Sequence, residues 1–285
     1  MKKGLLVKVL AGVMAATFLF AGCGSTGNKE AENTASSTAS SAAVDQSWEK
    51  VKGAGELILG LDDSFPPMGY RDENNEIVGY DIDLAKEVAS RLGIELKLQP
   101  INWDTKDQEL NTGNIDCIWN GMTITDDLKK VVLFSQPYMN NQQVLVVMAD
   151  STCKAKEDLA GKSIALQAGS SAKIALESKA DFKASLKEVV ELKDNTLCMM
   201  DLQTGNVDAV LMDEIVARYF IQMKGEKYRV LDEGLADEEY GIGFRKADVQ
   251  LMTKINDTLN DMAKEGTIAK ISEKWFGKDI STIGK

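Results

Sequence analysis

The chain has 285 residues, a formal net charge of −11 and no histidine. The acidic balance disfavours a nucleic-acid partner, and the sequence holds no basic patch interleaved with aromatic residues. Without histidine the chain lacks the commonest general base of enzymes and the commonest metal ligand, so we expect neither a metal nor a cofactor.

The N-terminus is typical of an exported protein. Residues 1–22 combine three lysines with an apolar run and end in small residues, which predicts a signal peptide. The apolar run is too short for a transmembrane span. The small residues before Cys23 resemble a bacterial lipobox, although Phe20 stands where leucine is more usual. We favour lipidation of Cys23; the alternative is a signal-peptide cut nearby that leaves Cys23 incidental.

The segment that starts at Cys23, residues 23–45, is rich in serine, threonine, alanine and asparagine and almost free of large apolar side chains. Such a segment cannot bury a core, so we expect a disordered tether. An anchor followed by a tether predicts an extracytoplasmic protein that is held at the cell membrane as a lipoprotein and folds in solvent.

The rest of the chain alternates apolar strands with helical patterns, which predicts a parallel-rich α/β fold. Asp81 is expected to N-cap the first helix and Gly93 to end it. We expect strands at 56–61, 95–98, 116–119, 131–134, 144–148, 163–166, 188–192, 207–212, 228–231 and 240–244. We expect helices at 81–92, 105–112, 127–130, 156–159, 172–178, 196–205 and 213–220, and one long amphipathic helix at 249–275.

Three cysteines lie in this body, and their spacing matches neither a CxxC motif nor a zinc site. Cys117 lies in an apolar strand, so we expect a small core residue. Cys153 and Cys198 could form a disulfide in an exported protein, and the sequence leaves that pairing open.

A polar turn follows the buried strand that contains Cys117. Asn120, Gly121, Met122 and Thr123 interrupt the apolar run before a short helix begins. In open α/β sheets, ligands bind beyond the carboxyl ends of the strands. The turn is therefore a candidate ligand site, and an ordinary strand–helix connection is the alternative.

Several motifs occur together in the order of one known family. They are GYDIDLAKEVASRLG, GNIDCIWNGMTITDDLKKVVLFSQPY, DLAGKSIALQAGSS, GNVDAVLMDE, EYGIGFRK and EGTIAKISEKWFG. With these motifs the chain resembles the family-3 bacterial extracellular solute-binding proteins, the amino-acid receptors of ABC importers, over about residues 56–277. Several ordered matches are far more specific than any single motif.

The resemblance implies a two-lobed α/β fold of the periplasmic-binding-protein type II class, each lobe a sheet flanked by helices. Lobe 1 would comprise residues 51–139 and 238–285, and lobe 2 residues 140–237. Two crossing strands, near 142–147 and 233–240, would form a hinge, and closure of the lobes would bury a ligand in the cleft.

The resemblance also implies the residues of the ligand site. Asp213 matches the acidic residue that pairs with an α-ammonium group through a charge-assisted bond. The alternatives are that Phe65 and Trp103, which match aromatic walls, are core residues and that Asp213 merely caps its helix. The implied ligand-binding residues are Asp62, Phe65, Trp103, Asn120, Gly121, Met122, Thr123, Gln167, Ser170, Ser171 and Asp213.

Within this set, three residues of the turn, Asn120, Gly121 and Thr123, match the position that binds the α-carboxylate and α-ammonium groups. The N–H groups near Gln167 and Ser171, at the start of a helix, would attract an anion.

One position departs from the family. Leu128 stands where the family usually carries an arginine that grips the α-carboxylate through two parallel bonds. Three interpretations follow. In the first, which we prefer, backbone N–H groups at Thr123 and Ser171 hold the carboxylate of an amino acid. In the second, the ligand is an amine or another cation stacked on aromatic faces. In the third, a neighbouring residue replaces the arginine in a way that the sequence does not reveal.

The function that the resemblance implies is the capture of a polar amino acid and its delivery to a membrane ABC permease. We expect a monomer and no enzymatic activity. The competing functions are a receptor for a cationic amine or modified amino acid, an enzyme similar to the cyclohexadienyl dehydratases, and a sensor. Against the last two, the chain has no histidine and no attached output domain.

Overall fold

The computed structural model describes residues 44–225 and 227–285, which form an α/β fold. The predicted signal peptide of residues 1–22, Cys23 and the predicted tether up to residue 43 lie outside the described residues. Within the described residues, no helix is both long enough and apolar enough to cross a membrane.

The first sheet has the strand order β5-β1-β6-β14-β7. Its strands are β1 (Glu56–Leu61), β5 (Glu95–Pro100), β6 (Cys117–Ile118), β7 (Val132–Phe134) and β14 (Gly243–Arg245). β1 pairs in parallel with both β5 and β6, whereas β14 is antiparallel to its neighbours. Leu57, Leu59 and Leu61 are fully buried. A Cβ at Gly60, between Leu59 and Leu61, would meet Ile115 Cδ1, so a larger residue there would displace the Ile115 side chain.

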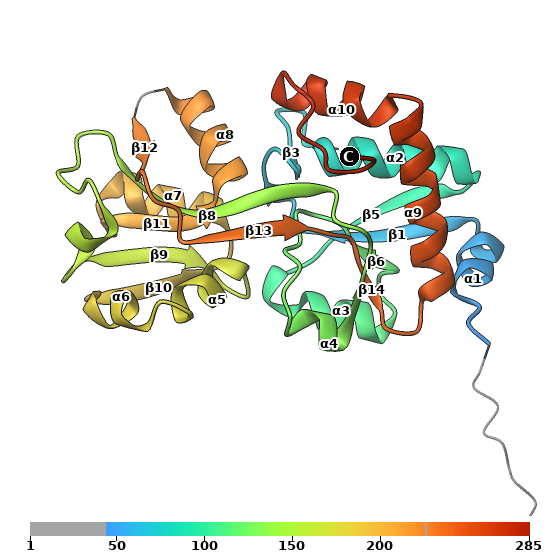
Figure 1. The fold of residues 1–285 in the computed structure, drawn as a ribbon, viewed down its shortest axis with the longest axis horizontal. Helices are drawn as coiled ribbons and strands as arrows, with labels where there is room; N and C mark the ends of the chain where they lie inside the picture. The colour runs from blue at the N-terminus through green and yellow to red at the C-terminus, as the bar shows by residue number, and fades with distance from the viewer. Residues whose placement is uncertain (1–43, 226) are drawn as a thin grey trace, which may run out of the picture. The chain divides into compact units, whose positions relative to one another are not determined.

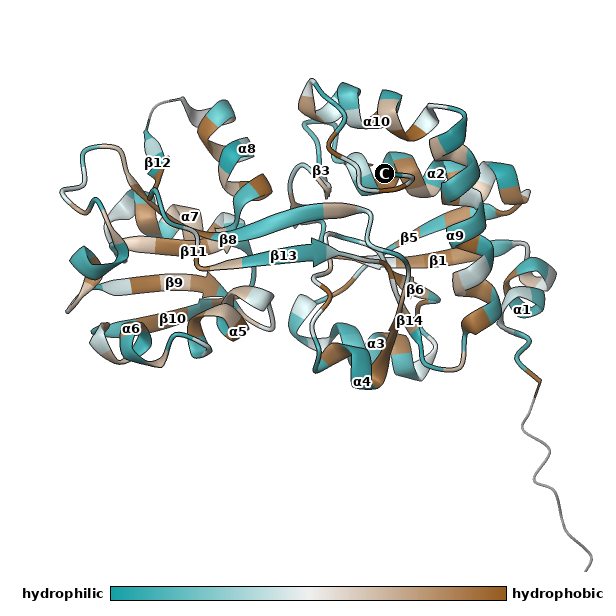
Figure 2. Ribbon diagram, viewed as in Figure 1, coloured by the Kyte–Doolittle hydropathy of each residue, from teal (hydrophilic) through white to brown (hydrophobic). Residues whose placement is uncertain are grey.

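The second sheet has the order β10-β9-β11-β8-β12, with β13 also paired to β8. Its strands are β8 (Met139–Met148), β9 (Ser163–Gln167), β10 (Glu188–Leu192), β11 (Ala209–Asp213), β12 (Tyr228–Val230) and β13 (Ala236–Tyr240). The pairs β9–β10 and β9–β11 are parallel, whereas β8 is antiparallel to β11, β12 and β13. The expectation of a parallel-rich sheet was therefore only partly right, because each main sheet holds two parallel pairs and its remaining pairs are antiparallel. Figure 2 shows β9 as largely hydrophobic and β13 as largely hydrophilic. A small third sheet contains β2 (Ser64–Phe65), β3 (Gly69–Arg71) and β4 (Ile77–Val78).

Helices cover both faces of each main sheet (Figure 1). Those of the first sheet and the N-terminus are α1 (Ser47–Ala54), α2 (Tyr80–Leu92), the 3-10 helix η1 (Trp103–Thr105), α3 (Lys106–Thr112), α4 (Leu128–Val131), α9 (Val249–Lys264) and α10 (Thr267–Phe276). Those of the second sheet are η2 (Lys156–Leu159), α5 (Ser171–Glu177), α6 (Ala180–Ser185), α7 (Asn195–Thr204) and α8 (Glu214–Lys224).

Three expectations about these elements were wrong. The N-cap of α2 is Gly79 and not Asp81, because the Asp81 carboxylate turns into the core. The expected long helix is two helices, α9 and α10, because Gly266 adopts a left-handed φ of 76° between them. The expected strand at 240–244 is divided between β13 and β14 at Gly241 and Ile242.

The chain passes between the two main sheets along β8 and β13, which pair antiparallel from Met139 with Tyr240 to Gln143 with Ala236. β8 follows β7 of the first sheet, and β13 precedes β14 of the same sheet (Figure 1). The fold is therefore two-lobed with a two-strand hinge, as expected. The residue numbers at which we divide the lobes remain a prediction.

The cysteines of the body are free thiols. Cys117, Cys153 and Cys198 are buried and unpaired, so the open question of a bridge between Cys153 and Cys198 is answered in the negative. The expected core position of Cys117 is confirmed, since it packs in the main apolar cluster. Burial also raises the pKa of the Cys198 thiol to about 12.

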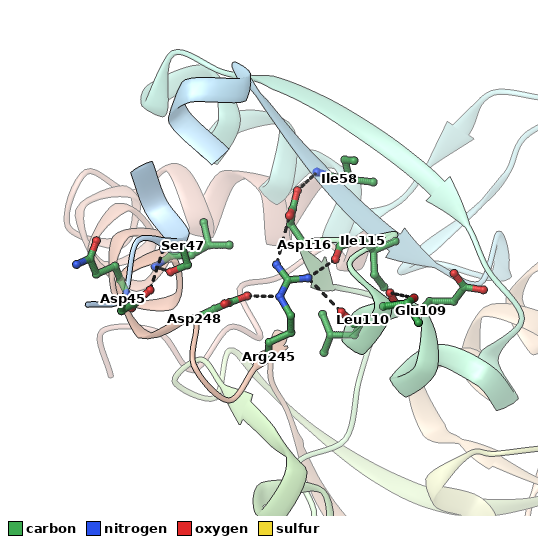
Figure 3. A network of polar contacts seen from close by, with 12 residues as sticks. Asp45, Ser47, Ile58, Glu109, Leu110, Ile115, Asp116, Arg245 and Asp248 are labelled. Atoms are coloured by element: carbon green, nitrogen blue, oxygen red, sulfur yellow. Dashed lines mark hydrogen bonds and ion pairs between the residues drawn. The ribbon is translucent and has the colours of Figure 1, made fainter. Parts of the chain in front are cut away.

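A largely buried charge network holds β14 of the first sheet to neighbouring segments (Figure 3). The guanidinium of Arg245 donates to the carbonyl oxygens of Leu110 and Ile115 at 3.1 and 2.6 Å. It also pairs with Asp248 at 2.6 Å and with Asp116 at 3.4 Å. The second carboxylate oxygen of Asp116 accepts from the N–H of Ile58 at 3.0 Å. One guanidinium thus joins β14 to the end of α3 and, through Asp116, to β1.

Replacing Arg245 with methionine should lower the free energy of unfolding by about 3 kcal/mol, because it leaves two largely buried carboxylates without their cation. Urea unfolding followed by circular dichroism measures the effect. The matched control is Arg218→Met, whose side chain is 66% exposed in an ion pair with Glu214, and which should change stability by less than about 1 kcal/mol. Equal losses in the two variants would contradict the role given to the network.

Candidate functional site

One cavity lies where loops of both main sheets meet. The carboxyl ends of β9 and β11 and the turn after β6 border it, as expected for an open α/β sheet. The free space inside is about 80 Å³. Because one water molecule needs roughly 10–15 Å³ of such space, the cavity suits a small solute and not a peptide. The lining residues are Phe65, Trp103, Lys106, Gly121, Met122, Thr123, Leu128, Gln167, Gly169, Ser170, Ser171, Ile174 and Asp213.

Nine of the eleven predicted site residues line this cavity, and Asp62 and Asn120 lie behind it. Asp62 accepts from the side-chain amide of Gln167 at 2.7 Å, which joins the first sheet to the second. Its backbone N–H donates to the side-chain oxygen of Asn120 at 3.0 Å. Burial raises the pKa of Asp62 to about 6, although the bond from Gln167 opposes the shift. Asp62 and Asn120 therefore support residues that line the cavity.

The turn after β6 depends on Gly121, which has a left-handed φ of 59°. A Cβ there would also lie 2.8 Å from Phe65 Cε1, so glycine permits both the turn and the close aromatic ring. The N–H of Gly121 donates to Asp81 at 2.8 Å and to the Tyr138 hydroxyl at 3.1 Å. The same hydroxyl donates to Asp81 at 2.9 Å.

Asp81 is a positioning residue that the sequence did not reveal, because an aspartate at a helix start is ordinarily a cap. It is completely buried. Burial raises its pKa to about 7, although the bonds from Tyr138 and Gly121 oppose the shift. The carboxylate holds the backbone of the cavity turn in place from within the core.

Asp213 ends β11 and occupies the N-cap position of α8, but its side chain makes no cap bond. Its carboxylate instead accepts from the Asn141 amide and the Tyr240 hydroxyl, both at 2.7 Å. The alternative that Asp213 merely caps its helix is therefore wrong. Burial, and next the charge of Glu238, raise the pKa of Asp213.

Glu238, on β13, is a second acid beside the cavity that was not among the predicted residues. One of its carboxylate oxygens lies 3.0 Å from the Thr123 hydroxyl and 3.3 Å from the Ser171 hydroxyl. The same oxygen accepts from the side-chain amides of Asn141 and Gln143, each at 3.0 Å. Its position in an acidic stretch of an edge strand is ordinarily that of a solvent-facing residue, so no sequence signal identified it.

Lys106 is the cationic residue among those that line the cavity, and it too was missed. It is the first residue of α3 and is only 7% exposed. Its ammonium donates to the carbonyl oxygens of Gly169 at 2.8 Å and of Trp103 at 3.3 Å. A lysine at the start of a helix is ordinarily solvated, which is why its position was not apparent.

The comparison with known families establishes the family to which the chain belongs. Residues 57–278 match the family described as bacterial extracellular solute-binding proteins, family 3. The chain belongs to this family. Its predicted membership is thereby confirmed.

Relatives of this family-3 solute-binding protein include two receptors named for cystine. The L-cystine-binding protein TcyJ of Escherichia coli (strain K12) is 31% identical over 234 residues, which cover 81% of this chain and 86% of that protein. The L-cystine-binding protein TcyA of Bacillus subtilis (strain 168) is 29% identical over 284 residues, which cover 99% and 100%.

A solved structure agrees with this fold. The crystal structure of an ABC uptake transporter substrate binding protein from Streptococcus pneumoniae with bound histidine matches with a TM-score of 0.81 and 36% identity. The match covers 84% of this chain and 99% of that chain.

In this solute-binding protein, Leu128 lines the cavity. An apolar side chain therefore borders the space at the position where the family resemblance predicts an arginine. The lining cation, Lys106, comes from a different helix, α3.

Asp81→Asn should flatten part of the pH dependence of stability. The folded pKa of Asp81, about 7, lies above its ordinary value of 3.8, so the folded protein keeps a proton that the unfolded chain has lost. As the pH rises from about 4 to about 7, the wild-type protein should therefore lose unfolding free energy relative to the variant, by up to roughly 1.4 kcal/mol per pH unit. Urea titrations across this range measure the difference.

The matched control is Asp261→Asn, because that carboxylate is 62% exposed. Its stability curve should run parallel to that of the wild-type protein. Parallel curves for Asp81→Asn and the wild-type protein would disprove the raised pKa.

Proposed function

We propose that this protein is the extracytoplasmic substrate-binding component of an amino-acid ABC importer and that the cavity binds a polar amino acid. The observation that carries the proposal is the acid pair Asp213 and Glu238 beside a cavity bordered by both sheets. The amide nitrogen of Asn141 donates to both carboxylates, at 2.7 and 3.0 Å. Their other hydrogen-bond partners are also neutral, so a ligand ammonium would supply the missing positive charge.

Two aromatic residues support a ligand with an organic side chain. Phe65 and Trp103 both line the cavity and are 4% and 8% exposed. Aromatic walls with a few convergent polar groups are the usual lining of small-molecule sites. The names of the relatives, which refer to cystine and histidine, support an amino acid as the ligand class.

The remaining parts of the proposal concern partners and location. We propose stoichiometric binding without turnover, delivery to a membrane permease, and anchoring through a lipid on Cys23. The family, whose description is extracellular and solute-binding, supports an extracytoplasmic receptor and not an enzyme.

A receptor for a cationic amine is the second candidate. It is favoured by the local charges, because Asp62, Asp213 and Glu238 surround a cavity that has one lining cation, Lys106. A zwitterion needs a positive group for its carboxylate, whereas a simple amine does not. The two candidates differ in the ligands that they predict.

A thermal-shift screen of the purified protein tests both candidates, with amino acids, cystine, polyamines and quaternary amines as ligands. A ligand at 100 times its Kd should stabilise the folded state by about 2.7 kcal/mol, or roughly 5–10 °C in Tm. Shifts with α-amino acids support the importer receptor. Shifts confined to amines would establish the second candidate, and turnover of a bound compound would overturn the assignment as a receptor.

Asp213→Ala should abolish binding of the amino acid found in the screen, because it removes the buried charge proposed to pair with the ammonium group. Asp213→Asn should weaken binding similarly while it keeps the volume of the side chain and an acceptor for Tyr240. Isothermal titration calorimetry measures both, and the exposed Asp181→Ala is the control. Unchanged affinity in the Asp213 variants would exclude this pairing.

A further inference from the structure

Lys106 is a buried ammonium group that pairs with no carboxylate of the described residues. Its two hydrogen-bond partners, the carbonyl oxygens of Gly169 and Trp103, are neutral. Among residues 44–225 and 227–285, no carboxylate oxygen lies within 4.0 Å of its nitrogen. Burial lowers the pKa of Lys106 even though Asp104 and Asp107 oppose the shift from a distance. A buried cation of this kind is stabilised most by an anion that enters its surroundings.

Within the part of the chain that the structure describes, the ammonium group also has an unused donor. A lysine ammonium carries three N–H groups, and two are directed to the carbonyl oxygens of Gly169 and Trp103. Lys106 lines the cavity, and its nitrogen lies 5.1 Å from the centre of the Trp103 ring. The third N–H is therefore available to a ligand group beside that aromatic wall.

Thr123 and Ser171, whose backbone N–H groups were expected to hold a carboxylate, already have an acid beside their side chains. The Glu238 carboxylate lies within hydrogen-bond distance of the hydroxyls of Thr123 and Ser171. Each hydroxyl has a single proton to donate. A ligand carboxylate at the same place would compete for these protons and would meet the negative charge of Glu238. Leu128, which also borders the cavity, offers no compensating charge.

We propose that Lys106 binds the carboxylate of the ligand, while Asp213 and Glu238 face its ammonium group. This inference rests on the proposed function and deepens it, since it selects solutes that carry both a carboxylate and an ammonium group. It also gives Lys106, on α3, the role that the family's arginine has at the position of Leu128, on α4. Lys106 is thereby a specificity-determining residue that separates amino acids from amines.

A purely structural role for Lys106 predicts a different behaviour. In that role, its bond to Gly169 would serve solely to link α3 to the turn after β9, and so to hold the two sheets together. Loss of such a link would weaken every ligand by the same factor. Loss of a carboxylate partner would weaken only ligands that have a carboxylate.

The test compares an amino acid that binds the wild-type protein with its carboxamide, which keeps the ammonium group and side chain but has no carboxylate. Lys106→Met removes the ammonium, and Lys106→Gln removes the charge while it keeps a donor for the Gly169 carbonyl. Calorimetry should show that both variants bind the amino acid at least about tenfold more weakly. Their affinity for the carboxamide should stay within about threefold of the wild-type value.

Lys106→Arg should recover part of the affinity for the amino acid. Lys173→Met is the matched control, because Lys173 lies on α5 with a 42% exposed side chain that pairs with Glu191. A cooperative unfolding transition of each ligand-free variant establishes that the variant is folded. If Lys106→Met does not fold, the result for Lys106→Gln decides the test.

Equal losses for amino acid and carboxamide, or no loss for either, would overturn the role of Lys106 and leave the proposed function intact. Absence of amino-acid binding in the wild-type protein would overturn the proposed function itself. The two failures are therefore distinguishable.

Discussion

The central constraint on this structure is a pair of acids, Asp213 and Glu238, that share the amide of Asn141 beside the cavity. Carboxylates removed from water require hydrogen-bond donors. That requirement accounts for the composition of β8, whose first half is polar and carries the buried Asn141 and Gln143, while its second half is apolar. The hydroxyl of Tyr240 adds a donor from β13. The two strands that connect the sheets, β8 and β13, thus also supply hydrogen-bond donors to the two acids.

The anchoring of the first sheet extends to the cavity through α3. This helix begins at Lys106, and its last turn is held where Arg245 donates to the carbonyl of Leu110. A cation at the C-terminus of a helix is favourable because the carbonyl groups there are unsatisfied. One end of α3 is therefore fixed by a partly buried guanidinium, and the other presents an ammonium group to the cavity. The position of Lys106 depends on contacts that lie outside the site.

Much of the fold and most of the cavity lining could be predicted, because both follow from short-range patterns. Apolar runs marked the strands, and the polar turns at Gly121 and Ser170 marked their carboxyl ends. Asp81, Lys106 and Glu238 could not be found in this way. Each is a charged residue in a sequence position that is ordinarily exposed. Contacts with distant segments bury Asp81 and Lys106 and partly cover Glu238. The division between α9 and α10 escaped prediction because the apolar periodicity continues across Gly266.

The buried free thiols have a practical consequence. Cys117, Cys153 and Cys198 are buried among apolar neighbours, and structural cysteines buried in this way are inert toward thiol reagents. A cysteine introduced on an exposed turn of a protein that begins after Cys23 can therefore be labelled selectively with a maleimide fluorophore. The native cysteines do not need to be replaced. Movements of the cleft then become measurable by fluorescence in an otherwise unaltered chain.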